Sequence, residues 1–283
     1  MKIKKMGAGK IRKPNLFLVG VARAGTSSWT SHLNQHPEIL MSREQRPNFF
    51  GEYEDNNSRY FNTEEKYLSL FKEAKNEKFL GDSSHVFGSL NAPKQIKQFN
   101  KNSKIIIILR SPIDILRSNI DAGGYNDVKE LVFTLRELLY YENLKRWITF
   151  FGKKNVHIIL FDDYIKDIEK EYKKVCDFLE IDNKFKPNFR NVHYSAKTNY
   201  SLFMKAIFYA YNKIPFTTRL KIKEILGGNK KKIQKFYRKV DNARQIQTII
   251  KPSDKKLLQR AFFLKEIEKT EKLINKKLDI WKY

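Results

Sequence analysis

Residues 15–29 read NLFLVGVARAGTSSW, and the organisation of the rest of the chain can be worked out from this stretch. Residues 15–20 form a short apolar run that ends in glycine, which is typical of a buried parallel strand. Residues 20–25 allow a tight loop between two glycines. From Thr26 onward, apolar side chains recur at helical spacing until His36-Pro37 ends the pattern. The stretch therefore predicts a strand, a loop and a helix in succession.

The alternation of strands and helices continues along the chain. Runs at 79–80, 105–109 (IIIIL) and 156–161 (VHIILF) predict further short strands. Helices are predicted after Ser111-Pro112, over 128–151, over 164–179 and over the terminal segment 254–277. Such alternation is typical of parallel sheets that are covered on both faces. We therefore expect an α/β fold with a central parallel sheet flanked by helices and a helical C-terminal portion.

Composition and length favour one folded domain. The chain has 283 residues, of which 41% are hydrophobic, so it can bury a substantial core. We predict a single domain over 1–283, with a basic tail at 1–13 and an irregular basic region at 195–250 that is a candidate lid. The single cysteine, Cys176, lies in an apolar helical pattern and is expected in the core. The N-terminus lacks the apolar part of a signal peptide, and no stretch approaches ~18 apolar residues, so we expect a cytoplasmic protein.

The loop between the first strand and its helix carries groups that bind phosphate. Glycines at 20 and 25 let successive amide N–H groups point at one anion, and the helix N-terminus adds partial positive charge. The hydroxyls of Thr26, Ser27 and Ser28 and the guanidinium of Arg23 add further donors. The spacing resembles the Walker A pattern, but Thr26 occupies the position of its lysine. The sequence thus predicts a phosphate-binding loop whose cation, Arg23, lies inside the loop.

A second phosphate site is predicted where the strand at 105–109 ends. Arg110 follows this strand directly, Ser111-Pro112 opens a helix, and Ser118 lies about two turns farther along it. One guanidinium and one hydroxyl in this arrangement can bind a single phosphate. Ligands of parallel sheets bind outside the carboxyl ends of the strands. Both motifs are therefore expected at the same edge of the sheet.

These motifs resemble those of the sulfotransferases that use 3′-phosphoadenosine 5′-phosphosulfate (PAPS), in particular the carbohydrate and bacterial types. The resemblance implies a P-loop-like three-layer sandwich and transfer of a sulfuryl group to a hydroxyl or amine. It implies that Arg23 acts at the phosphosulfate, where the family usually has lysine, and that Arg110 and Ser118 bind the 3′-phosphate. A guanidinium does not lose a proton, so Arg23 is not expected to donate one. The implied cofactor-binding residues are Arg23, Ala24, Gly25, Thr26, Ser27, Ser28, Arg110 and Ser118.

The acceptor must lose a proton, and two residues compete as the base. His85 follows the predicted strand at 79–80, resembles the basic histidine of the small-molecule sulfotransferases, and has a suitable ordinary pKa. The carbohydrate and protein-tyrosine enzymes usually carry an acidic base just before a Phe-Phe motif, which Phe49-Phe50 resembles. That position holds Arg46, and a shift of two residues restores Glu44. His85, Glu44 and substrate-assisted chemistry all stay open.

The resemblance leaves the acceptor open among a glycan, a glycolipid or other lipid-linked sugar, and a small metabolite. One alternative is a P-loop kinase for a nucleotide or small molecule, although the Walker lysine is missing and the strand at 105–109 ends in Arg110 rather than Asp. Another is a nucleic-acid-binding protein, because the net charge is +25 and aromatic residues interrupt the basic stretch 230–244. Since no nucleic-acid-binding signature and no metal-ligand spacing of histidines is present, neither nucleic acid nor a metal is expected.

Overall fold

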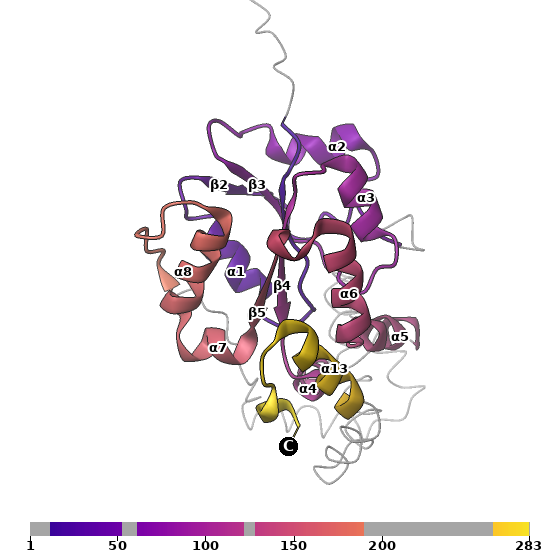
Figure 1. Ribbon diagram of the computed structural model, residues 1–283. Helices are drawn as coiled ribbons and strands as arrows, with labels where there is room; N and C mark the ends of the chain where they lie inside the picture. Colours follow the sequence, from indigo (N-terminus) through magenta and orange to yellow (C-terminus); the bar gives the residue numbers. More distant parts are fainter. Residues whose placement is uncertain (1–11, 53–60, 122–127, 190–262, 283) are drawn as a thin grey trace, which may run out of the picture.

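The centre of the computed structural model is a five-stranded sheet in which neighbouring strands are parallel (Figure 1). The structure describes residues 12–52, 61–121, 128–189 and 263–282. The strand order is β2-β3-β1-β4-β5. The strands are β1 (Leu16–Leu18), β2 (Ile39–Met41), β3 (Phe79–Asp82), β4 (Lys104–Leu109) and β5 (Val156–Leu160). The predicted parallel sheet is confirmed, whereas β2 was not predicted, because its three apolar residues lie between polar Glu38 and Ser42 and form no longer apolar run.

Buried aliphatic side chains explain why the middle of the sheet forms. The five residues Ile105–Leu109 of β4 are fully buried, as expected for a strand that is covered on both faces. β1 runs beside β4, and the close approach continues past the end of β1. There, a side chain at Gly20 would lie 2.9 Å from the main-chain nitrogen of Ile108. Glycine at this position therefore lets the loop leave the sheet alongside β4.

Helices cover both faces of the sheet and give the three layers that the resemblance implied (Figure 1). On one face lie α1 (Thr26–Leu33), α7 (Phe161–Lys166) and α8 (Ile168–Leu179); on the other lie α3 (Ala92–Phe99) and α6 (Tyr140–Phe151). Further helices are α2 (Glu64–Leu68), α4 (Pro112–Asp121), α5 (Val128–Glu137) and α13 (Leu264–Ile274). Short 3-10 turns occupy Ser69–Phe71, Lys153–Asn155 and Asp279–Trp281.

The single helix predicted over 128–151 is wrong, because α5 ends at Glu137 and α6 begins at Tyr140. The side-chain amide of Asn143 donates hydrogen bonds to the main-chain oxygens of Arg136 (2.8 Å) and Glu137 (3.3 Å). These bonds satisfy carbonyl groups that a continuous helix would use internally. The break therefore depends on a contact from the next helix, which helical periodicity does not reveal.

The segment after β5 also differs from its prediction. The strand expected over 156–161 ends at Leu160, and Phe161 already begins α7. The helix expected over 164–179 is divided at Asp167, whose carboxylate accepts a hydrogen bond from the Lys170 N–H at 3.0 Å. This is an N-cap interaction, which stabilises the start of α8. Cys176 on α8 is fully buried, as predicted.

The C-terminal segment packs against the start of α7. The indole N–H of Trp281 donates to Asp162 at 2.6 Å, and Lys276 forms an ion pair with Asp163. The predicted terminal helix over 254–277 is observed as α13, while its first part, 254–262, lies outside the described residues. The same holds for the candidate lid at 195–250, the basic stretch 230–244, and residues 1–11 of the basic tail.

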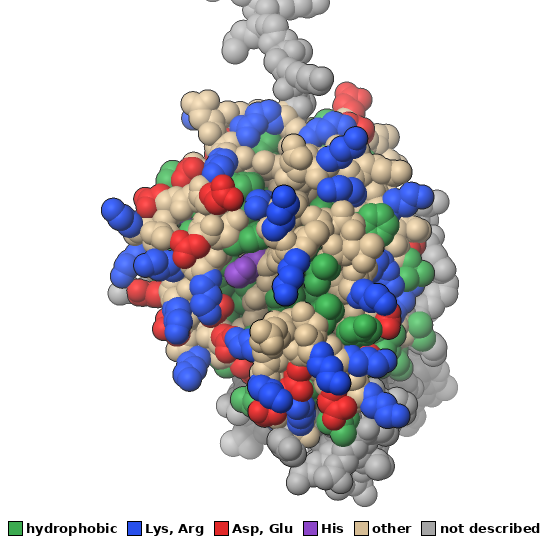
Figure 2. Space-filling view, in the orientation of Figure 1, with side chains coloured by type: hydrophobic (Ala, Val, Ile, Leu, Met, Phe, Trp, Pro, Cys, Tyr) green, Lys and Arg blue, Asp and Glu red, His purple; other side chains and the backbone are tan. Residues whose placement is uncertain are grey.

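The surface of the described residues shows no concentrated basic patch on the face in Figure 2. There, Lys and Arg side chains are scattered among Asp and Glu side chains. The positive charge seen on this face is therefore spread as on an ordinary solvated surface. In the described ranges, no helix combines the length and apolarity that crossing a lipid bilayer requires.

The strand order places one crevice at the carboxyl end of the sheet. The chain leaves β1 toward β2 on one side, whereas it leaves β4 toward β5 on the other. Connections that diverge from two neighbouring strands leave a crevice between their carboxyl ends, where ligands of such sheets bind. The loop with Arg23 follows β1, and Arg110 follows β4. The fold therefore brings the two predicted phosphate motifs to the same crevice.

Candidate functional site

The loop after β1 has the backbone geometry of an anion-binding turn. Arg23 (φ 67°) and Gly25 (φ 94°) both adopt left-handed conformations, and the Ala24 N–H between them donates to the Val21 oxygen at 3.2 Å. Within the described part of the chain, no side chain caps α1, which begins at Thr26. The first-turn amides of α1 are therefore not taken up by a capping side chain, and the helix dipole favours an anion there.

Gly25 is required both by the backbone and by its surroundings. Its positive φ is costly for other residues, and an added Cβ would lie 3.2 Å from the Tyr164 ring of α7. Next to it, the hydroxyl residues Thr26 and Ser28 are buried, and Ser27 is partly exposed. The loop thus combines a fixed backbone turn with three hydroxyl groups at the start of α1.

Arg23 joins the two phosphate motifs directly. Its Nε donates to the Ser118 hydroxyl and its Nη2 to the Ser118 main-chain oxygen, both at 3.1 Å. Arg110 in turn donates from Nη1 to the main-chain oxygen of Arg23 at 2.9 Å. Arg110 and Ser118, which were predicted to form one phosphate site, thus both bind to Arg23. The Ser118 oxygen accepts from Arg23 but keeps its own O–H, which can still be donated to a phosphate.

Two aromatic residues that the sequence did not single out fix Arg110. Its guanidinium lies over the Phe161 ring, 4.4 Å from the ring centre, and the Tyr140 hydroxyl donates to its main-chain oxygen at 2.7 Å. A planar guanidinium stacks well on an aromatic face and keeps its edge available for an anion. Phe161 follows β5 just as Arg110 follows the neighbouring β4, and this shared position is the signal that could have revealed the contact.

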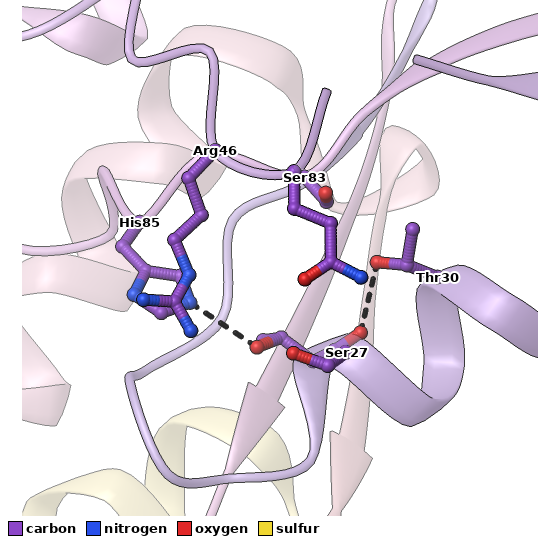
Figure 3. Close-up of a pocket in the computed structure, with 7 residues that line it drawn as sticks. Ser27, Thr30, Arg46, Ser83 and His85 are labelled. Carbon is purple, nitrogen blue, oxygen red and sulfur yellow. Dashed lines mark hydrogen bonds between the residues drawn. The ribbon is translucent and has the colours of Figure 1, made fainter. Parts of the chain in front are cut away.

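His85 lies beside the phosphate loop on the other side of β1. Its Nε2 and the Thr26 hydroxyl are 3.2 Å apart (Figure 3). The turn that carries it is fixed by buried Asp82, which accepts hydrogen bonds from the Tyr67 hydroxyl and the Ser84 N–H, each at 2.7 Å. Because β3 pairs with β1, this turn ends next to the loop. His85 is therefore positioned at the end of the site that lies toward β3.

A small pocket opens between His85 and the start of α1 (Figure 3). Its lining residues are Thr26, Ser27, Thr30, Gln45, Arg46, Ser83 and His85. Glu44 is not among them; its side chain is exposed, and its main-chain oxygen accepts a hydrogen bond from the Ser42 hydroxyl at 2.7 Å. Of the two candidate bases, the geometry favours His85, because only His85 lies at this pocket. Arg46 and Gln45 reach the pocket from the segment where Glu44 was expected.

Burial and the positive charge of Arg46 lower the pKa of His85 to about 3. Both act in the same direction, because a cationic imidazole loses hydration in the protein and is repelled by the guanidinium. His85 is therefore neutral at ordinary pH, and its unprotonated nitrogen can accept a proton. As a base it is weak until negative charge enters the site.

The buried carboxyl group of Glu137 contacts the backbone of the phosphate loop. Glu137, at the end of α5, is buried, and its carboxyl group accepts a hydrogen bond from the Ala22 N–H. Burial raises the pKa of Glu137 to about 8. Gly88 makes room for it, since a Cβ there would lie 2.9 Å from the Glu137 Cγ. No sequence pattern signals this contact, because it joins segments far apart in the chain.

The described residues contain no cluster of His, Cys, Asp and Glu that would hold a metal ion. Of the other histidines, His36 is buried, with Nε2 2.9 Å from the Asp182 oxygen and Nδ1 accepting from the Glu38 N–H at 3.1 Å. His36 therefore ties the end of α1 to the segment around Asp182. The site is thus built from guanidinium, hydroxyl, amide and imidazole groups.

Comparison with known proteins places this arrangement in a family. The family described as the sulfotransferase domain matches residues 13–262 of the chain. The chain belongs to the sulfotransferase family. A crystal structure of a sulfotransferase from Alicyclobacillus acidocaldarius has the same fold, with a TM-score of 0.66 and 19% identity over 96% of this chain and 100% of that one. The P-loop-like fold implied by the two motifs is confirmed.

Curated sulfotransferases of different kinds are similar to this chain. Heparan sulfate glucosamine 3-O-sulfotransferase 6 of Homo sapiens is 22% identical over 193 residues, which cover 62% of this chain and 54% of that protein. Sulfotransferase 2A6 of Mus musculus is 26% identical over 124 residues, which cover 37% of this chain and 44% of that protein. The chain thus spans about half the length of the curated sulfotransferases it matches.

Proposed function

We propose that this protein is an enzyme that transfers a sulfuryl group from PAPS to a hydroxyl or amine of an acceptor. The observation that carries the proposal is the hydrogen bond from Arg110 to the main-chain oxygen of Arg23, which joins two cationic motifs at the tips of neighbouring strands. A ligand with anionic groups at two positions fits such a paired site. Family membership supports the same reaction.

The loop after β1 is proposed to bind the 5′ side of PAPS. Arg23 neutralises charge at the phosphosulfate, while the hydroxyls of Thr26, Ser27 and Ser28 and the amides from Gly25 onward donate to its oxygens. The loop suits the phosphosulfate because it offers N–H groups, O–H groups and a guanidinium. These donors lie next to a helix start that no side chain caps. Arg110 and Ser118 are proposed to bind the 3′-phosphate.

His85 is proposed to accept the proton of the acceptor. In the overall step, the bond between sulfur and the phosphate oxygen breaks and a bond from sulfur to the acceptor oxygen or nitrogen forms. The acceptor proton moves to the neutral imidazole, and the electron pair of the broken bond stays on the phosphate, where Arg23 stabilises it. The proximity of His85 to the Thr26 hydroxyl supports this role.

The kinase alternative is less well supported by the same residues. A Walker lysine would be needed where Thr26 stands, and the Thr26 hydroxyl instead lies 3.2 Å from His85. The nucleic-acid alternative rested on 230–244, which lies outside the described residues. Glycan, lipid-linked sugar and small-metabolite acceptors, together with a cytoplasmic location, stay predictions from the sequence.

Calorimetry on the full chain with adenosine 3′,5′-bisphosphate and with ATP tests the proposal. We expect the bisphosphate to bind at least about tenfold more tightly, because Arg110 and Ser118 would contact only its 3′-phosphate. Tighter binding of ATP, or no binding of the bisphosphate, would contradict the proposal. Turnover is then measured with radiolabelled PAPS and a panel of acceptors.

A further inference from the structure

The pocket beside His85 is lined only by polar side chains. They provide hydroxyls, an amide, the imidazole and one guanidinium, with no aliphatic or aromatic side chain and no carboxylate among the lining residues that the structure describes. Sites for apolar ligands are lined mainly by hydrophobic and aromatic side chains. The side-chain chemistry of this pocket therefore favours contact with a polar group over contact with the apolar skeleton of a steroid or a phenol.

Arg46 is the only permanent charge that lines this pocket in the described chain. Its side chain lies beside the His85 ring in Figure 3. Across the residues that the structure places, no carboxylate forms an ion pair with its guanidinium. By contrast Arg43, in the same segment, pairs with Glu73 at 3.1 Å. Within the described ranges, the cation next to the proposed base thus has no carboxylate partner.

Arg46 is held in this position by a strained stretch of backbone. Arg46 (φ 60°) and Asn48 (φ 51°) are both left-handed, a conformation that residues other than glycine rarely adopt. The Asn48 N–H donates to the Ser84 hydroxyl at 2.9 Å, and Ser84 is itself bound to Asp82. The turn that carries His85 and the segment that carries Arg46 are therefore linked to each other, and their side chains are oriented together.

We propose that Arg46 selects an acceptor that is a polar hydroxyl compound bearing a carboxylate or sulfate group near the reacting hydroxyl. The inference rests on the proposed function and names the acceptor class of the same site. In this arrangement the guanidinium binds the anionic group by charge-assisted hydrogen bonds, and the exposed Gln45 offers a further polar contact. The hydroxyl to be sulfated then lies toward His85.

The positive charge of Arg46 also couples acceptor binding to proton transfer. Arg46 lowers the pKa of His85, because two neighbouring positive charges repel each other. An anion bound to Arg46 cancels much of this repulsion, so the imidazole accepts a proton more readily when an anionic acceptor is present. A neutral acceptor leaves the repulsion in place. The preference for charged acceptors should therefore appear in kcat as well as in KM.

The test compares charged and neutral acceptors on the full-length protein. Glucuronate and glucose 6-sulfate are compared with glucose, first for binding to the protein loaded with adenosine 3′,5′-bisphosphate and then for turnover with PAPS. We expect each charged probe to bind at least about tenfold more tightly than glucose, the effect of a charge-assisted hydrogen bond. In Arg46→Ala, the ratio between charged and neutral probes should fall to about one. Arg43→Ala, the matched control, should keep the wild-type ratio.

Each contrary result has a separate meaning. If the bisphosphate does not bind, the proposed function itself fails. If it binds but neither charged probe is preferred over glucose, or a hydroxysteroid is the better acceptor, only the inference about Arg46 fails. If Arg46→Ala weakens bisphosphate binding as strongly as it weakens the charged probes, Arg46 serves the donor rather than the acceptor. That result would also overturn the inference.

Discussion

Arg110 donates a hydrogen bond to the main-chain oxygen of Arg23 over 2.9 Å, so one arginine fixes the loop that carries the other. The contact orients the loop through its backbone and leaves the Arg23 guanidinium to interact with Ser118. A substitution in one motif should therefore alter the geometry of the other. Under the proposed function, this coupling would hold the two ends of a nucleotide in a single defined geometry.

Replacing Arg110 tests this relationship. In Arg110→Ala, both a proposed phosphate contact and the support of the loop are lost, so affinity for adenosine 3′,5′-bisphosphate should fall about 10–100-fold, as for one or two charged hydrogen bonds. Arg110→Lys should recover little, because an ammonium neither forms a planar fork nor stacks on Phe161. Calorimetry measures both values, with Arg43→Ala as the control. Unchanged affinity in Arg110→Ala would refute the assignment.

Replacing His85 should affect turnover rather than donor binding. Without the proposed base, kcat of His85→Ala should fall about 100-fold or more, while the affinity for adenosine 3′,5′-bisphosphate stays within a few-fold of wild type. His85→Asn keeps a polar partner for Thr26 but cannot take up the proton, so it should be equally slow. Steady-state kinetics decides the matter, and full activity of either variant excludes His85 as the base.

The pH dependence of His85 follows from its lowered pKa of about 3. The neutral form persists in the folded protein well below pH 6.5, so kcat/KM for PAPS should not decline between pH 7 and pH 5 because of this residue. Since the folded pKa lies below the unfolded value, stability is lost as pH falls from about 6.5 toward 3. Thermal unfolding of His85→Ala should lack this part of the acid destabilisation. An activity loss in wild type centred near pH 6.5 that is absent in His85→Gln would contradict the assignment.

Glu137 should make the stability of the fold depend on pH in the direction opposite to that of His85. Its pKa is raised from 4.5 to about 8, so the folded protein holds the proton more tightly than the unfolded chain does. The resulting stability is fully present below pH 4.5 and is lost as pH rises to about 8. Glu137→Gln mimics the protonated group, so its melting temperature should rise relative to wild type between pH 5 and pH 8. A constant difference across this range would show that Glu137 does not titrate in this way.

Two glycines with positive φ separate backbone strain from ligand binding. Gly25→Ala forces alanine into φ 94° and against Tyr164, whereas Gly152→Ala has a similar φ of 76° but open space around it. Both should lose stability, by about 1–2 kcal/mol or more for the backbone alone. Only Gly25→Ala should also weaken bisphosphate binding. Equal binding by the two variants in calorimetry would show that the loop geometry is not needed for the donor.

The sequence predicted the parts of the site that depend on local patterns. A glycine-bounded loop after a strand, and an arginine before a Ser-Pro helix start, can each be recognised within ten or so residues, and strand-end placement brings them together. The side-chain partners could not be predicted, because Arg23 reaches Ser118 across the sheet rather than along the chain. The same reason applies to Phe161 beneath Arg110, and to the break after α5 that depends on Asn143.

The pocket beside His85 could be anticipated only in part from the sequence. His85 can be proposed from the sequence because it follows a predicted strand, whereas the sequence shows Arg46 only at the position of an expected glutamate. Its orientation toward His85 depends on two left-handed residues and on the Asn48 contact with Ser84, none of which leaves a sequence signal. Exposure does not distinguish Glu44 from its neighbours, because Gln45 and Arg46 are exposed as well, and only the path of the segment sets which of them line the pocket.

The position of β2 at the margin of the described sheet has a consequence for how such an enzyme can diversify. The segment carrying Gln45 and Arg46 follows this outermost strand, two places away from β1 and three from β4. Insertions or substitutions there need not alter the spacing of the strands that carry Arg23 and Arg110. Under the proposed function, sequence change in this outer segment could therefore alter the choice of acceptor while the residues proposed to bind PAPS stay the same.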